Sequence, residues 1–301
     1  MAVGRLGAEP SALSVRVRRT VALLRRRGYA LPPDRLAEIN IGGPVSVSEL
    51  RWAVAADRDL ALAEGLVVER VAEGEAAAIR GRALGHPEAA APYRDLTVQF
   101  VRKLVALAPF IASVSIAGSL ASGGFRATDD VDLNLIVEDG HRHIAYVVVN
   151  LLGLLHAMRH RAKPVDDLTR RPLAPRLMTV NLVLERSQCR PLARQDEDMA
   201  FELLMSEPVF GFEAFRELIE QNPGLVDHFP QLAEKSAPLL VSTPRRLSAR
   251  LFPALLDGPA WHLGRVAWRY MQWTRRDRPE ALARVAFVRA TMRPYTLFDE
   301  A

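Results

Sequence analysis

Two aspartates separated by a single residue are the part of the sequence best suited to chemistry. Asp130 and Asp132 stand on either side of Val131, just before an apolar run at residues 133–137. On an extended strand alternate side chains point to the same face, so the two carboxylates project together while Val131 points into the core. Carboxylate oxygens are the ligands that Mg²⁺ or Mn²⁺ takes in proteins. The spacing therefore predicts a divalent-metal site held by Asp130 and Asp132.

A glycine–serine pair precedes these aspartates at the end of an apolar, β-branched run. Gly118 and Ser119 follow residues 111–117, and ten residues separate Ser119 from Asp130. Glycine lets a phosphate approach the backbone closely, and the serine hydroxyl and nearby N–H groups can donate to its oxygens. In the loop that follows, Arg126 is a candidate phosphate contact, with a solvated loop arginine as the alternative. Asp129 is expected to cap the turn.

This order of residues resembles the signature of the DNA polymerase β-like nucleotidyltransferase superfamily. In that signature a strand leads to Gly-Ser, and about ten residues later Asp-x-Asp stands on the next strand. The resemblance is close over residues 111–137 and extends by expected element order over residues 93–190. It implies an α+β fold and metal-dependent transfer of a nucleoside monophosphate from an NTP donor. Asp130 and Asp132 would hold the metals, with Gly118 and Ser119 binding phosphates. An Asp-rich turn between two buried strands is the alternative.

The sequence departs from this superfamily at the position of its third carboxylate. The strand expected at residues 177–185 places Asn181 there. Asparagine offers a metal one neutral carbonyl oxygen but cannot accept a proton as a base. Glu185 shares that face about 13 Å further along the strand, and Asp166 and Asp167 precede it. The stretch also resembles a group of bacterial nucleotidyltransferase-domain proteins with Asn here, which supports the fold more than the activity.

Three functions follow from this departure and stay open at the level of sequence. The site is active because another group completes it, or it binds nucleotide and metal without transfer, or it is a scaffold on an inherited fold. For an active enzyme the acceptor is a small molecule, an RNA end or a protein side chain. The lack of a strongly basic groove pattern favours a small molecule. Nothing in the sequence indicates an oligomeric state.

The regions around the motif divide the chain into three expected parts. Residues 89–200 form the nucleotidyltransferase core, residues 1–88 a winged-helix-like domain, and residues 201–301 a helical region. Hydrophobic periodicity and turn residues set the expected elements. The expected helices are 15–28, 46–56, 59–64, 93–108, 143–160, 199–205, 212–219 and 260–275. The expected strands are 66–71, 75–79, 111–117, 133–137 and 177–185, with a linker at 81–92.

The flanking regions suggest two further interactions. A winged helix often binds DNA, and the first helix carries arginines at positions 16, 18, 19, 25, 26 and 27. The next two helices carry Glu49, Asp57, Asp59 and Glu64, a poor surface for a phosphate backbone, so a structural or partner-docking role is favoured over DNA binding. In the C-terminal region Trp261 and Trp268 share a helical face with Arg265. Packing of this stripe on the core is favoured over binding of a base.

Composition narrows the class of protein. Of 301 residues, 49% are hydrophobic and 25% charged, which is typical of a globular chain. The single cysteine, Cys189, excludes an internal disulfide and a Cys-based zinc site, and it suits a reducing cytoplasm. No export signal is recognised, and the most apolar run, residues 144–158, is too short for a membrane span. His156 and His160 have zinc-binding spacing but no third ligand, so ordinary helix histidines are expected.

Overall fold

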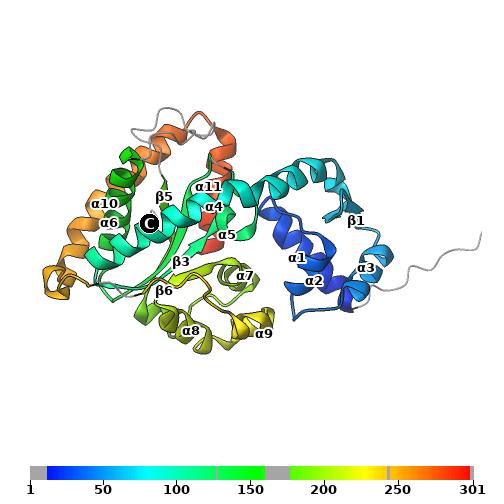
Figure 1. The fold of residues 1–301 in the computed structure, drawn as a ribbon, viewed down its shortest axis with the longest axis horizontal. Coiled ribbons are helices and arrows are strands. Elements are labelled where there is room, and N and C mark those ends of the chain that lie inside the picture. Colours follow the sequence, from blue (N-terminus) through cyan, green and yellow to red (C-terminus); the bar gives the residue numbers. More distant parts are fainter. Residues whose placement is uncertain (1–11, 127, 160–176, 243–244, 299–301) are drawn as a thin grey trace, which may run out of the picture.

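Helices and two β-sheets make up the mixed α+β fold of this protein (Figure 1). The computed structural model describes residues 12–126, 128–159, 177–242 and 245–298. Within these ranges a four-stranded sheet lies at the centre, and a small helical unit with a two-stranded sheet lies at one end. None of the described helices combines the length and the apolar character that a membrane span needs.

The central sheet is formed by the strands that carry the Gly-Ser and Asp-x-Asp residues. Its strands are β3 (Ile111–Ala117), β4 (Val131–Val137), β5 (Met178–Glu185) and β6 (Glu207–Phe210), in the order β5-β4-β3-β6. β3 pairs antiparallel with β4 and β6, whereas β4 and β5 are parallel. The strands expected at 111–117, 133–137 and 177–185 are therefore confirmed.

Alternate residues of β4 face two different layers of helices. Val131, Leu133 and Leu135 are buried in the core that includes α4 (Ala76–Leu107) and α6 (Arg142–Arg159). Ile136 belongs to the opposite core, built on α7 (Glu197–Met205), α8 (Phe212–Glu220) and α9 (Pro223–His228). Because side chains alternate along a strand, Asp132 and Asn134 share the face of Ile136. The predicted inward orientation of Val131 is confirmed.

The N-terminal unit, residues 12–75, packs three helices on a β-hairpin. A capping box at Ser46 and Glu49 begins its third helix, and an isolated bridge pairs Leu31 with Val67. The elements are α1 (Ala12–Arg26), α2 (Pro33–Glu38), α3 (Val47–Ala56), β1 (Leu60–Ala63) and β2 (Leu66–Glu69).

The hairpin lies earlier in the chain than the sequence predicts. β1 occupies the segment expected to be helical at 59–64, and the hairpin turns at Glu64 and Gly65, where φ is +51° and +77°. Residues 75–79, expected to be the second strand, instead enter a helix at Ala76. That strand prediction was wrong because the alanine-rich sequence favours helix.

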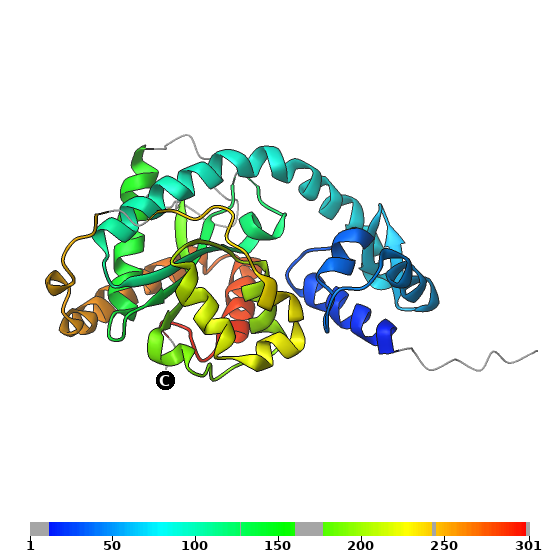
Figure 2. The same cartoon turned by 60° about the horizontal axis from the view of Figure 1, so that its bottom comes forward.

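The segment expected to be a linker, residues 81–92, is part of the long helix α4. This helix of 32 residues runs from the N-terminal unit across the central sheet (Figures 1 and 2). It includes Pro87 and Pro92, which are both exposed. Burial of Phe100, Val101 and Leu104 against the sheet anchors its second half. Tertiary packing thus extends a helix through residues that usually end one.

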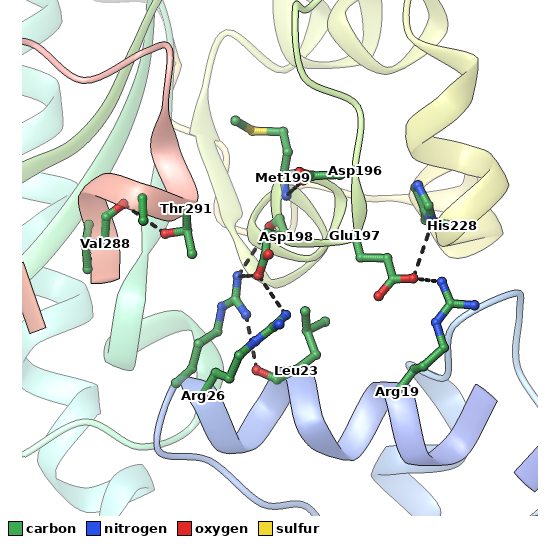
Figure 3. A network of polar contacts seen from close by, with 12 residues as sticks. Arg19, Leu23, Arg26, Asp196, Glu197, Asp198, Met199, His228, Val288 and Thr291 are labelled. Carbon is green, nitrogen blue, oxygen red and sulfur yellow. Dashed lines mark hydrogen bonds and ion pairs between the residues drawn. The ribbon is translucent and has the colours of Figure 1, made fainter. Parts of the chain in front are cut away.

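The arginine-rich helix α1 docks on α7. Arg19 forms an ion pair with Glu197, and Arg26 and Arg27 both reach Asp198, over 3.2 and 2.8 Å. Figure 3 shows Arg19 and Arg26 of α1 directed at the first turn of α7. These carboxylates lie at a helix N-terminus, where the macrodipole also favours negative charge. The arginines that suggested DNA binding therefore contact the protein itself.

The region expected to be helical, residues 201–301, also contains β6 of the central sheet, and its other described elements are helices and 3-10 turns. α10 (Asp257–Arg275) packs along α6, and α11 (Pro279–Met292) lies near the site end of the sheet (Figure 1). Short 3-10 turns complete the described elements; they are Arg70–Glu75, Arg186–Cys189, Pro230–Glu234, Ala249–Leu251 and Ala254–Leu256.

Candidate functional site

A cavity of about 300 Å³ lies between one end of the sheet and the helices α6, α10 and α11. One side is acidic and polar, and the other carries aromatic, apolar and basic side chains. The polar side is formed by Ser119, Asp129, Asp130, Asp132, Thr179 and Asn181, with Tyr146 and Asn150 from α6. The opposite side is formed by Trp268, Met271, Gln272, Arg275, Val285, Val288, Arg289 and Met292. We refer to it as the site cavity.

Gly118 ends β3 in a conformation that only glycine adopts easily. Its φ is +61°, and a Cβ built on it would lie 2.2 Å from Oδ2 of Asp132. The register places Ala117, the preceding residue, directly opposite Asp132. Glycine is therefore favoured here for two reasons: it adopts the left-handed backbone conformation without strain, and it leaves room for the Asp132 carboxylate. The sequence pattern Gly-Ser followed by Asp-x-Asp is a packing requirement as well as a chemical one.

Asp129 organises the loop between α5 (Gly118–Ser122) and β4. Its Oδ2 accepts hydrogen bonds from Ser119 Oγ over 3.0 Å and from the backbone N–H of Arg126 over 3.1 Å. The prediction that Asp129 caps the turn is confirmed by these bonds. The Arg126 side chain is exposed and does not line the site cavity, so the structure does not bring this predicted phosphate contact to the aspartates.

Asp130 and Asp132 both line the site cavity, as their spacing predicts. Thr179 on the neighbouring strand donates from Oγ1 to Asp132 Oδ1 over 2.7 Å and lies opposite it in the register. That bond fixes one oxygen of Asp132 and holds the carboxylate in a single rotamer. Sequence reasoning missed Thr179, although its place on β5, two residues before Asn181, puts it on the same face.

Asn181 also lines the site cavity, and hydrogen bonds of its side-chain amide with Asn134 and Glu202 fix its orientation. Its Nδ2 donates to Asn134 Oδ1 over 3.0 Å and to Glu202 Oε1 over 2.8 Å. Asn134 Nδ2 donates to the same Glu202 oxygen over 3.1 Å. Because both amide protons of Asn181 are engaged, its Oδ1 is the atom left to accept a hydrogen bond or a metal ion. Only an amide, and not a carboxylate, can make these two donations.

Glu202 is a carboxylate that sequence reasoning missed. Burial raises the pKa of its carboxyl above the ordinary value. Hydrogen bonds from Asn134 and Asn181 and the positive charge of Arg27 oppose that shift. Glu202 does not line the site cavity, so it acts on the site through the two asparagines. The available signal was Glu202 itself, the single acidic residue of the helix expected at 199–205, combined with Asn134 two residues beyond Asp132.

The basic side of the site cavity comes from the C-terminal helices. The Arg289 guanidinium lies over the Trp268 ring, with Cζ 4.8 Å from the ring centroid. Arg275 lines the same side. Trp261 and Trp268 are half-buried and belong to none of the described core clusters, and Trp268 lines the site cavity, so the expected packing of this stripe on the core is not seen. Arginines and aspartates thus line the same cavity, a combination that suits a ligand with both anionic and metal-bound parts.

The helices that form this wall are fixed to the rest of the fold. Asp257, the first residue of α10, accepts hydrogen bonds from the backbone N–H groups of His143 and Ile144 over 2.7 and 2.9 Å. It therefore caps the N-terminus of α6. Tyr295, just after α11, accepts from the backbone N–H of Ala193 over 2.6 Å. The separation between the acidic and basic sides is thus built into the fold.

The donor set suits a hard divalent cation. Asp130 and Asp132 offer carboxylate oxygens and Asn181 offers an amide oxygen, the ligand types that Mg²⁺ and Mn²⁺ accept. No group of three or more His, Cys, Asp or Glu residues with metal-binding geometry occurs in the ranges that the structure describes. Solvent and a bound anion would have to supply the other ligands. His160, the expected neighbour of His156, lies outside these ranges, as do Asp166 and Asp167.

Most of the predicted site residues meet in one place. Ser119, Asp130, Asp132 and Asn181 line the site cavity, and Gly118 abuts Asp132 at its edge. Glu185 lies elsewhere, because its Oε1 accepts from the backbone N–H of Gly140 at the far end of β5. Comparison of the chain with family models, with curated proteins and with solved structures finds no match.

Proposed function

We propose that the site cavity is a metal-dependent nucleotidyl-transfer site on a polymerase β-like core. The observation that carries the proposal is the joint placement of Asp130 and Asp132 beside a left-handed Gly118, in a cavity that two arginines also line. Phosphoryl-group chemistry needs charge neutralisation and positioning more than covalent catalysis. Carboxylate-held metal on one side and guanidinium groups on the other supply both.

The residues divide the task by position. Asp130 and Asp132 would hold Mg²⁺, which neutralises triphosphate charge and polarises the reacting phosphorus. Thr179 keeps Asp132 oriented, and Ser119, held by Asp129, presents its oxygen to the site cavity. Arg275 and Arg289 supply positive charge to phosphate oxygens from the opposite wall. The site cavity volume of about 300 Å³ suits a small-molecule ligand, which favours a small acceptor over RNA or protein.

The flanking unit supports a winged-helix-like architecture, since its order is helix, bridge strand, two helices and a β-hairpin. It supports DNA binding poorly. Arg19 and Arg26 of α1, and Arg27 just after it, are paired within the chain. The exposed side chains of α3 include Glu49, Trp52 at 63%, and a single arginine, Arg51. A structural role for this unit, docked on α7, is the function that these contacts favour.

A catalytically degenerate nucleotide-binding module is the second candidate, and Asn181 favours it. Asn181 cannot act as a base, and among the described residues that line the site cavity the carboxylates are those of Asp129, Asp130 and Asp132, with no further one to replace the missing third carboxylate. Simple restoration of the carboxylate is also disfavoured by the packing. In Asn181→Asp both donations are lost, and the new carboxylate faces Glu202. Like charges at this separation repel strongly at a partly buried site.

The first experiment measures thermal stabilisation by each NTP, with and without Mg²⁺. We expect at least one NTP to raise the melting temperature only with Mg²⁺, and Asp130→Ala/Asp132→Ala to abolish the effect. Glu138→Gln/Asp139→Asn, at the other end of β4, is the matched control and should keep it. Absence of a shift with every NTP in the natural protein would overturn the proposal.

A second experiment separates an active enzyme from a binding module. Turnover is measured as pyrophosphate release in the natural protein, in Asn181→Asp and in Asn181→Asp/Glu202→Gln. For a transferase with a weakened site, the double variant should exceed both others, since the Glu202→Gln change removes the repulsion. Saturable NTP binding without pyrophosphate release in any of the three proteins would identify the binding module.

A further inference from the structure

A second cavity of about 320 Å³ lies at the junction of the N-terminal unit and the sheet. It is bounded by residues 28–31 after α1, by the first half of α4 and by residues 121–124 at the C-terminal end of α5. It shares no lining residue with the site cavity. We refer to it as the junction cavity.

The junction cavity has more positive than negative charge. Arg35, Arg82 and Arg94 line it, and Glu207 is the carboxylate on its wall. Arg94 pairs with Glu207 over 2.6 Å, and Arg35 pairs with Glu38. Arg82 differs from both, because it donates to the carbonyl of Gly28 over 2.9 Å and forms no salt bridge with any carboxylate in the described ranges. The positive charge of Arg82 is therefore not neutralised by a direct partner.

The surroundings of Arg82 make this charge unfavourable without an anion. Burial lowers the pKa of its guanidinium, and the like charge of Arg126 lowers it further. Asp129 and Glu75 act in the opposite direction, but neither is within salt-bridge distance. Two arginines that repel one another beside a glycine-containing loop form a common setting for phosphate recognition.

One further donor beside the junction cavity has no acceptor in the described part of the chain. Nε of Arg94 is buried without a hydrogen-bond partner in the described part of the chain. His86 Nδ1 accepts from the backbone N–H of Phe125 over 3.1 Å, which places the proton of the neutral ring on Nε2. Burial and the charge of Arg94 lower the pKa of His86, which favours the neutral ring. A buried donor without an acceptor is costly, which adds to the cost of positive charge at this junction.

We propose that the junction cavity binds a small organic phosphate. Arg82 would pair with the phosphate group, since a guanidinium matches its geometry through two parallel hydrogen bonds. The remaining lining includes Tyr29, Leu31, Ile79 and Met205, which suit an apolar or planar organic body. The volume is at the lower end of the range for metabolite sites. This binding does not depend on whether the site cavity transfers nucleotides.

Such a ligand would contact both the N-terminal unit and the loop that carries Ser119. The Tyr29 ring packs on Gly124, where a Cβ would lie 2.8 Å from Cε1 of the tyrosine. Gly124 in turn donates its N–H to the carbonyl of Ser119 over 3.2 Å. A ligand seated between Arg82 and this loop would therefore reduce the mobility of residues 118–126, which border the site cavity.

The test is isothermal titration of the full chain with ribose 5-phosphate, AMP and inorganic phosphate, in EDTA and at low ionic strength. EDTA removes metal-dependent binding at the aspartates, and ribose is the uncharged control. We expect saturable binding of at least one organic phosphate and none of ribose. Arg82→Gln should weaken binding about tenfold or more, because a charge-assisted hydrogen bond is lost.

Two variants act as controls for site and for charge. Arg80→Gln, on the same helix but paired with Glu64 outside the junction cavity, should bind as the natural protein does. Arg82→Lys, which keeps the charge, should bind better than Arg82→Gln, and it replaces the latter should that variant fail to fold. No binding of either organic phosphate, equal binding by Arg82→Gln, or loss of binding in Asp130→Asn/Asp132→Asn would each overturn the proposal.

Discussion

Replacement of Gly118 by alanine tests whether this glycine is required by the Asp132 carboxylate. The new Cβ would lie 2.2 Å from Asp132 Oδ2, 3.1 Å from Cγ and 3.2 Å from Cβ. Asp132 must therefore rotate, which breaks its hydrogen bond with Thr179. The left-handed φ of +61° costs alanine about 1–2 kcal/mol by itself. Loss of a hydrogen bond to a charged group adds about 1.5–3 kcal/mol.

Gly123→Ala is the matched control for the backbone cost. Gly123 also has a positive φ, +95°, but a Cβ built on it meets no atom within 4 Å. Its backbone cost is at least that of Gly118, because +95° lies outside the region that alanine tolerates best. Any larger loss of stability in Gly118→Ala must therefore come from the contact with Asp132.

The assay is urea denaturation of Gly118→Ala, Gly123→Ala and Asp132→Ala, together with the Gly118→Ala/Asp132→Ala double variant. We expect Gly118→Ala to lower the free energy of unfolding by about 3–5 kcal/mol, and Gly123→Ala by about 1–2 kcal/mol. The excess should largely disappear in the double variant, as a coupling energy of about 1–3 kcal/mol. Equal effects of the two alanines, or an excess that persists without Asp132, would refute the reasoning.

Three further predictions concern stability and reactivity. Both Arg27 and Arg26 pair with Asp198, but the Arg27 side chain is 10% exposed and that of Arg26 is 51% exposed. Arg27→Ala should therefore lower the free energy of unfolding by about 2–3 kcal/mol, and Arg26→Ala by less than about 1 kcal/mol. Equal losses for the two variants in urea denaturation would contradict this. Burial lowers the pKa of Lys235 to about 8, so between pH 8 and 10.5 the unfolded state binds more protons than the folded state and stability should rise with pH. Denaturation curves of Lys235→Met should lack that rise, and a rise of the same size in the variant would exclude Lys235 as its source. Burial raises the pKa of Cys189 to about 12, so its thiol should react with a disulfide reagent only on unfolding, and rapid modification of the folded protein would argue against the buried position.

The sequence predicts the centre of the fold better than its ends. β3, β4 and β5 can be recognised in the sequence because they are apolar, β-branched runs, one ending at Gly118 and others close to the aspartates. These signals come from residues that are adjacent in the sequence. The error at 81–92 arose where glycine and proline indicated a break. There, packing of the following turns on the sheet and the helix propensity of alanine maintain α4. A local sequence pattern carries no information on stabilising contacts with residues far away in the chain.

Some residues of the candidate site could be predicted from the sequence and others could not. Asp130, Asp132 and Asn181 follow from strand periodicity, whereas Glu202 acts on Asn181 from a helix whose position depends on the whole fold. The wall with Trp268 and Arg289 comes from the last helices of the described chain, and no spacing rule relates these to β4. Arg126 was misleading because a position in the loop does not determine the direction of a long side chain.

The docking of α1 on α7 also limits how the sequence can change over time. Positive charge lies at Arg19 of α1 and at Arg27 just after it, and negative charge on α7 at Glu197 and Asp198. A reversal of sign on one helix alone would bring like charges together in this contact. Substitutions on the two helices should therefore be inherited as compensating pairs. Exchange of the charges between Arg27 and Asp198 should accordingly be tolerated better than either change alone.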